Sequence, residues 1–120
     1  MALFDVAGAR AELHRLRPVL DEFVTVRADA AELAASVGAG GAATALGGLP
    51  ELKAAQARLD ELMTEISRSG AELKGLAPLL VDFPSERAGV PVLLCWLEGD
   101  PELAWYHRFD LGFAGRRPLP

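Results

Sequence analysis

His107 is the side chain with the widest range of chemistry in this sequence, because imidazole acts as a base or a metal ligand near neutral pH. It stands close in sequence to Trp105 and Phe109, so we expect it at the edge of an apolar core. We favour a structural histidine whose ring nitrogen bonds a backbone carbonyl, since buried polar groups find partners. The alternative is a metal site in which Asp110, or carboxylates of the helices, join His107.

Asp82 and Cys95 are two further side chains of chemical interest, and they stand on neighbouring predicted strands. The strand register that we expect places both on the face of the sheet opposite His107, out of its reach. A metal site built from these residues is therefore not predicted, and a cysteine–histidine nucleophile pair is disfavoured on the same ground. A lone buried cysteine is expected to act as a small apolar side chain.

A glycine-rich loop with the sequence GFAGRR, residues 112–117, ends in two adjacent arginines. Exposed amides beside guanidinium groups can hold a small anion, a carboxylate or a phosphate. The loop has neither the spacing nor the following helix of a nucleotide-binding fingerprint. We favour a simpler role, in which Phe113 anchors the chain end and the arginines pair with acidic residues of the helices. The candidate ligand-binding residues are His107, Arg116, Arg117, Trp105 and Asp110.

Composition excludes several classes of partner. The net charge of −5 is spread along the 120 residues, and no basic face is expected that would bind nucleic acid. The longest apolar run, Val90 to Leu97, is far shorter than the roughly 20 residues that span a bilayer. A single cysteine favours a reducing compartment. We expect one cytoplasmic domain over residues 1–120, with no membrane and no nucleic-acid partner.

The elements that must position these side chains begin with a long helix. Apolar residues recur at spacings of three and four from about Val6 to Ser36, behind the capping residue Asp5. Pro18 lies inside this helix and removes a backbone donor, which predicts a kink near residues 14–18.

A second helix is predicted from about Pro50 to Ser69 by the same spacing of apolar residues. The intervening residues 37–48 are mostly Gly and Ala, which is typical of a flexible linker. Both apolar stripes are narrow, and we therefore expect an antiparallel helical hairpin over residues 5–70.

Residues 71–120 follow a different pattern, in which short segments rich in β-branched and aromatic residues alternate with turn formers. Three strands are predicted, at Leu79–Phe83, Val90–Leu97 and Glu102–Phe109. A tight turn at Gly99-Asp100 would pair Leu94 with Trp105 and Val92 with His107, and a loop over residues 86–89 would pair Phe83 with Val92. The predicted fold class is α+β, with the helical hairpin packed on a three-stranded antiparallel meander.

Side chains alternate along a strand, so this register divides the meander into two faces. The face expected to receive the helices carries Leu79, Val81, Phe83, Val92, Leu94, Trp96, Leu103, Trp105 and His107. The other face carries Leu80, Asp82, Leu93, Cys95, Leu97, Ala104, Tyr106 and Arg108. The second set is too apolar for a surface in water, which indicates a partner, most simply a second copy of the chain.

Residues 79–119, LLVDFPSERAGVPVLLCWLEGDPELAWYHRFDLGFAGRRPL, closely resemble the C-terminal signature of a bacterial family, domain of unknown function 2203. The resemblance rests on the segments LVDFP, LLCWLEG, ELAWYH and GFAGRRPL, and on the AELKG that precedes them. The N-terminal half is similar more loosely, through FDVAGARAEL and the Gly-rich break before LPELKA. The resemblance implies a shared fold and assigns no activity, cofactor or catalytic residue.

Two functions remain open at this point. The one that we favour is a homodimeric structural or interaction module, because the short chain carries two apolar sheet faces and two narrow helical stripes. The alternative is a small enzyme or a ligand- or metal-binding domain with a pocket near His107 and the loop of residues 112–117. The sequence leaves open which of these is correct and names no substrate.

Overall fold

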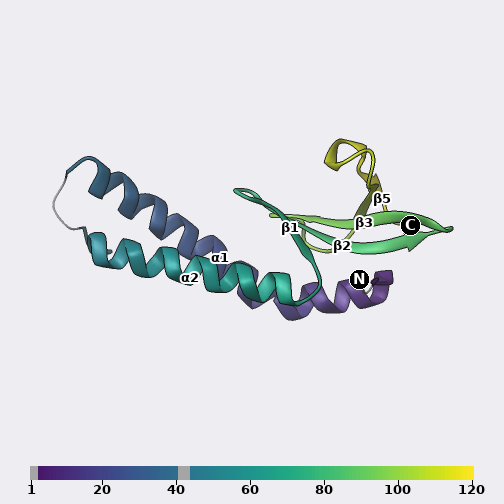
Figure 1. Cartoon of the computed structure of the whole chain (residues 1–120), viewed down its shortest axis with the longest axis horizontal. Coiled ribbons are helices and arrows are strands. Elements are labelled where there is room, and N and C mark those ends of the chain that lie inside the picture. Colours follow the sequence, from purple (N-terminus) through teal and green to yellow (C-terminus); the bar gives the residue numbers. More distant parts are fainter. Residues whose placement is uncertain (1–2, 41–43) are drawn as a thin grey trace. The chain divides into compact units, whose positions relative to one another are not determined.

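The computed structural model describes residues 3–40 and 44–120, and its fold is α+β. Two helices, α1 (Val6–Gly38) and α2 (Leu49–Arg68), are followed by an antiparallel sheet with the strand order β1-β2-β3-β4-β5 (Figure 1). The strands are β1 (Glu72–Leu76), β2 (Leu79–Arg87), β3 (Val90–Leu97), β4 (Trp105–Arg108) and β5 (Arg117–Pro118), and a 3-10 helix, η1 (Phe113–Gly115), precedes β5. The predicted three-stranded meander is therefore incomplete, because two short edge strands flank it.

The chain divides into two compact units. One unit consists of residues 1–16 and 66–120, and it contains the sheet together with the first turns of α1. The other consists of residues 17–65, which belong mostly to the two helices. That residues 1–120 act as a single domain stays a prediction.

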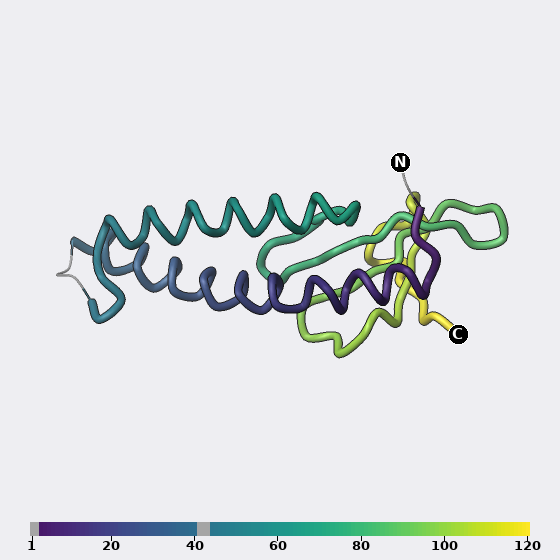
Figure 2. Tube along the Cα trace, turned by 90° about the horizontal axis from the view of Figure 1, so that it is seen from below, coloured from purple at the N-terminus to yellow at the C-terminus, as the bar shows by residue number. Residues whose placement is uncertain are grey.

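Within residues 17–65 the two helices lie side by side, as both views show (Figure 1, Figure 2). Ala30, Leu33 and Leu52 form a buried cluster between them. The Arg58 guanidinium donates to both carboxylate oxygens of Glu22, at 2.6 and 2.7 Å, and links the helices a few turns from that cluster. The kink predicted around Pro18, which lies inside α1, stays a prediction.

The connection between the helices is only partly described, since residues 41–43 of the predicted linker lie outside the described residues. The described remainder contains a tight turn in which the backbone groups of Thr44 and Gly47 exchange two hydrogen bonds of 2.9 Å. At the other end of the chain's helical part, Asp5 caps α1 as expected, because its Oδ1 accepts from the Gly8 amide at 2.6 Å.

The hairpin between β2 and β3 has a two-residue turn at Ala88-Gly89, where both residues have positive φ, 51° and 79°. This is the backbone conformation that matches the twist of paired strands. The turn is two residues shorter than predicted, so Phe83 pairs with Leu94 and not with Val92. A shift of two residues keeps every side chain on its expected face, and this part of the face assignment is confirmed.

The register between β3 and β4 is where the prediction was wrong. Cys95 pairs with Trp105 and Leu93 pairs with His107, which is a slip of one residue from the predicted partners Leu94 and Val92. The tight turn expected at Gly99-Asp100 does not close the hairpin, because residues 98–104 all lie outside the two strands. A slip of one residue moves every side chain of β4 to the opposite face. Trp105 and His107 therefore share a face with Cys95.

The two faces of the sheet have different covers. Phe83 packs edge-on against Phe4, with ring centroids 5.3 Å apart, on the side where the first turns of α1 lie. On the other side, drawn in yellow in Figure 1, the C-terminal segment turns back over the sheet, and the Arg116 guanidinium stacks 4.7 Å from the centre of the Trp105 ring. Leu93 and Cys95 are only 5% and 0% exposed. The centre of the apolar face predicted to need a partner is thus buried within one chain, while Leu80 and Leu97 on the same face are partly exposed.

Candidate metal centre

Three side chains of different chemistry meet on the face covered by the C-terminal segment. Asp82 of β2, Cys95 of β3 and His107 of β4 each offer a ligand atom, and these atoms all lie within 4.8 Å of one another. Their exposed fractions are 2%, 0% and 4%. Among the described residues, this is the group of three or more such side chains that could hold a metal ion.

The sheet register explains why they converge. Asp82 and Cys95 are direct partners across β2 and β3, so their side chains leave the same face at neighbouring positions. His107 pairs with Leu93, two residues before Cys95, and therefore stands diagonally across from Cys95 on the same face. The prediction that Asp82 and Cys95 lie on the face opposite His107 is wrong. It depended on the predicted register of β4, which differs by one residue from the register in the structure.

The orientation of His107 is fixed by its own strand. Its Nδ1 lies 3.0 Å from the backbone carbonyl oxygen of Arg108. A carbonyl oxygen only accepts hydrogen bonds, so Nδ1 carries the proton and donates. The expected bond from the histidine to a backbone carbonyl is confirmed. In the neutral ring this leaves the lone pair on Nε2, and such a backbone anchor is the usual support of a metal-binding histidine.

The second nitrogen points at a carboxylate. His107 Nε2 lies 3.3 Å from Asp82 Oδ2, while Asp82 Oδ1 is buried without a hydrogen-bond partner among the described residues. A neutral imidazole would thus present a lone pair to a carboxylate oxygen, and two acceptors at this distance need a proton or a cation between them. Burial raises the pKa of the Asp82 carboxyl, while the nearby charges of His107 and Lys74 act in the opposite sense.

Cys95 supplies the sulfur of the cluster. Burial raises the pKa of its thiol to about 12, and the neighbouring Asp82 carboxylate adds to this effect. Reactive cysteines have lowered pKa values and some exposure to solvent, whereas this sulfur is completely buried. The arrangement is therefore unsuited to a free cysteine nucleophile, and it suits a thiol that is deprotonated by a metal ion.

The donor set fits zinc and similar soft-to-borderline divalent ions, which bind thiolate, imidazole and carboxylate together. Tetrahedral zinc with ordinary bond lengths places its ligand atoms about 3.3–3.6 Å from one another. The 3.3 Å between Nε2 and Oδ2 already matches this spacing, and the upper bound of 4.8 Å leaves about 1 Å of closure for side chains. The buried, unpartnered Asp82 Oδ1 would gain a partner as well.

Of the residues proposed from sequence, the structure brings only His107 into this cluster. Trp105 stands next to Cys95 and is half-buried under Arg116. The Arg116 guanidinium forms an ion pair with Asp100 and lies between the rings of Trp105 and Phe113. Its carboxylate partner thus comes from the connection of residues 98–104 and not from a helix.

The remaining two candidates lie away from the cluster. Asp110 is exposed and forms an ion pair with Arg108 at 3.0 Å. Arg117 is exposed in β5, where it pairs with Tyr106. Sequence reasoning discarded Asp82 and Cys95. The predicted register already placed these two residues on one face of the sheet, and the structure shows that they pair directly across β2 and β3.

Comparison with known protein families adds a relationship but no activity. A family model described as an uncharacterized conserved protein, DUF2203, matches residues 2–119. The chain belongs to this family. The resemblance noted in the sequence is confirmed and extends to the N-terminal half. No curated protein and no solved structure matches this DUF2203 chain.

Among the described residues, neither helix has an apolar stretch long enough to cross a bilayer.

Proposed function

We propose that this protein binds one zinc-class divalent ion through Asp82, Cys95 and His107, and that the ion stabilises the sheet. The observation that carries the proposal is the buried contact of 3.3 Å between His107 Nε2, whose ring is anchored through Nδ1, and Asp82 Oδ2. Cys95 adds a third, chemically different ligand atom within 4.8 Å. Such a set is costly to bury without a cation, because each polar group loses its water.

The ion is proposed to be structural. Three protein ligands leave one position of a tetrahedron for a water molecule, which is also the arrangement of many catalytic zinc sites. All three ligands, however, are at most 4% exposed, so a substrate has no open route to the ion in this conformation. A structural ion in such a site contributes its binding free energy to folding. No reaction is assigned.

The chain contains a matched pair of histidines for the test, since His14 is exposed on α1 and His107 is buried in the cluster. Apoprotein would be titrated with Zn²⁺ and with Co²⁺, with native mass spectrometry reporting the number of bound ions. We expect one tightly held ion, a thiolate charge-transfer band with Co²⁺, and loss of both in H107Q but not in H14Q.

Two results would contradict the proposal. One is a wild-type protein that retains no ion at micromolar metal. The other is equal weakening by H14Q and H107Q, which would place the ion on the surface. Because H107Q removes a buried side chain, its folding would be checked by circular dichroism, and C95S gives a second variant that keeps the size of the side chain.

A second candidate function is self-association, as the sequence suggested. Its original motive has weakened, because Leu93 and Cys95 at the centre of that face of the sheet are buried within one chain. What supports it is an apolar groove of about 390 Å³ in which Leu3 and Phe109 are 56% and 52% exposed. A second copy of the chain would bury these side chains. Native mass spectrometry at tens of micromolar would show a dimer that F109E weakens, and a strictly monomeric wild type would end this hypothesis.

A further inference from the structure

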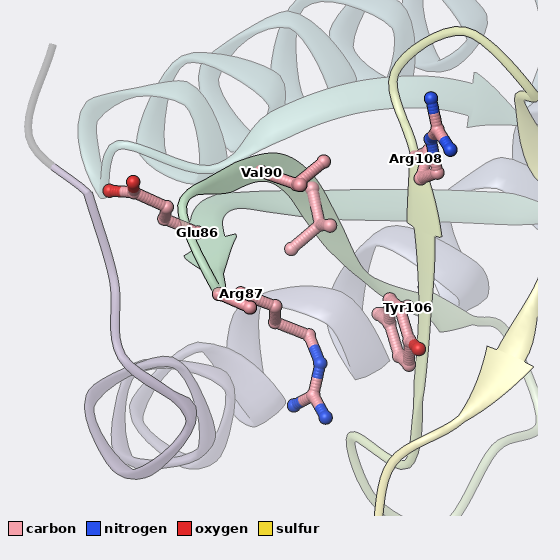
Figure 3. Close-up of a pocket in the computed structure, with 7 residues that line it drawn as sticks. Glu86, Arg87, Val90, Tyr106 and Arg108 are labelled. Atoms are coloured by element: carbon pink, nitrogen blue, oxygen red, sulfur yellow. The ribbon is translucent and has the colours of Figure 1, made fainter.

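An open groove lies on the face of the sheet opposite the proposed metal centre. Its volume is about 620 Å³, and Figure 3 shows the side chains that surround it: Glu86, Arg87, Val90, Tyr106 and Arg108. Tyr106 and Arg108 precede and follow His107 in β4, so their side chains leave the other face of the strand. The groove thus uses the strand that carries His107 without sharing any side chain with the metal centre.

Arg87 is the distinctive residue of this groove. Its guanidinium lies 4.6 Å from the centre of the Tyr106 ring, and both side chains project to the same side of the hairpin (Figure 3). Among the described residues, no carboxylate forms an ion pair with it, in contrast to Arg58 and Arg116. The ring holds the planar cation in place and leaves its hydrogen-bond donors unused.

The second cation at the groove, Arg108, is only loosely committed. It pairs with Asp110 at 3.0 Å, and the side chains of the two residues are 55% and 60% exposed. Exposed ion pairs of this kind contribute little, so a competing anion could replace the Asp110 carboxylate at small cost. The Tyr106 side chain also lines the groove, and its hydroxyl adds a further donor.

The carboxylate of Glu86 points away from Arg87 and Tyr106 (Figure 3), and the rest of the lining is apolar and small. Val90 and Val92 form part of the wall, and Val92 is buried in the sheet. Ala88 also lines the groove, and it adopts a positive φ of 51°, a conformation that favours Gly or Asn over Ala. A ligand body with apolar surface would therefore meet a complementary wall.

We propose that this groove binds a small organic anion, a carboxylate or phosphate group joined to an apolar or aromatic body. The anionic group would take the planar donors of Arg87, which match carboxylate and phosphate oxygens in pairs. The body would lie against Tyr106 and the valines. The proposal is independent of the metal centre, because no residue is common to the two sites.

The test is a titration of the ¹⁵N-labelled full chain, followed by NMR, with three probes: phenyl phosphate, 3-phenylpropionate and inorganic phosphate. Ligands of this size bind with dissociation constants of roughly a millimolar or below. We expect saturable shifts at residues 86–90 and 106–108 for at least one phenyl compound, with inorganic phosphate much weaker. The phenyl compound that binds more tightly identifies the anionic group.

Variants decide whether Arg87 is responsible. R87M should weaken binding about tenfold or more, and R87K should weaken it less, because lysine keeps the charge but not the paired donors. R68M removes an exposed arginine elsewhere in the same unit and should leave binding unchanged. Absence of saturable shifts, equal effects of R87M and R68M, or equal binding of inorganic phosphate and both phenyl compounds would each overturn the proposal.

Discussion

The affinity of the proposed centre for Zn²⁺ should depend steeply on pH, because the ion has to displace a proton from Cys95. The thiol has a pKa of about 12 in the folded protein, as a consequence of its complete burial. Metals bind the thiolate, so binding releases this proton. The affinity should therefore rise as pH rises, at least tenfold for each pH unit below that pKa.

The magnitude follows from the same value. At pH 7 the thiol lies about five units below its pKa, and each unit corresponds to about 1.4 kcal/mol, so forming the thiolate costs about 7 kcal/mol. Apparent zinc-binding free energies of about 10–16 kcal/mol at pH 7 in small domains already include the ionisation of ordinary thiols, so the additional cost here is that of the three units between 9.0 and about 12, about 4 kcal/mol. The ion can offset the cost of the thiolate, but the affinity near pH 7 should be lower than that of an exposed site with the same ligands.

Isothermal titration calorimetry in two buffers of different ionisation enthalpy would count the released protons. We expect at least one proton for each ion, and an affinity that climbs about 30-fold or more between about pH 6.5 and 8. C95S is the control, since a hydroxyl does not ionise in this range, and it should bind weakly with a flatter profile. Release of no proton by the wild type, or an affinity independent of pH, would refute the role of Cys95.

Three further predictions concern stability and the chain's end. Without metal, the free energy of unfolding should fall by about 1.4 kcal/mol per pH unit above about pH 9. The reason is that the Cys95 thiol ionises near 9.0 in the unfolded chain but stays protonated in the folded protein. Chemical denaturation of C95A at several pH values should lack this slope. F83A should cost about 3–5 kcal/mol in a denaturant titration, since Phe83 is fully buried against Phe4. R116M, which removes the pair with Asp100 and two ring contacts, should speed hydrogen exchange at residues 113–119, and unchanged exchange would count against a fastening role for Arg116.

The elements that repeat a short local pattern were predictable from sequence. The spacing of apolar residues located both helices to within two residues at each end, and Asp5 marked the start of α1. The hairpin of β2 and β3 was found because both strands are long and rich in apolar residues. Even with a turn of the wrong length, the buried face of these strands was assigned correctly.

The edge strands were missed for the opposite reason. β1 has the sequence ELKGL, in which polar side chains and a glycine leave no apolar alternation to detect. β5 is only two residues long, and its pairing with β4 depends on a chain reversal through η1. Such short edges are defined by the strand that they join and not by their own sequence.

The cluster of Asp82, Cys95 and His107 was not predicted because a tight hairpin turn was assumed at Gly99-Asp100. Gly99-Asp100 looks like a hairpin turn in sequence, but Asp100 instead accepts from the Leu97 amide at 3.0 Å and pairs with Arg116, and the chain continues for several residues before β4. The first contact is local, whereas the second comes from a residue 16 positions further along the chain. The residue types that could bind a metal were recognised, whereas their common face required the register.

The connection of residues 98–104 also bears on which changes the protein can tolerate in evolution. A substitution within it alters one side chain, but an insertion or deletion that shifted the pairing of β4 with β3 by one residue would turn every side chain of β4 to the opposite face. His107 would then exchange places with its neighbours Tyr106 and Arg108, and both the metal centre and the anion groove would lose their β4 residues together. Both proposed sites therefore depend on the same register of β4, which follows this connection.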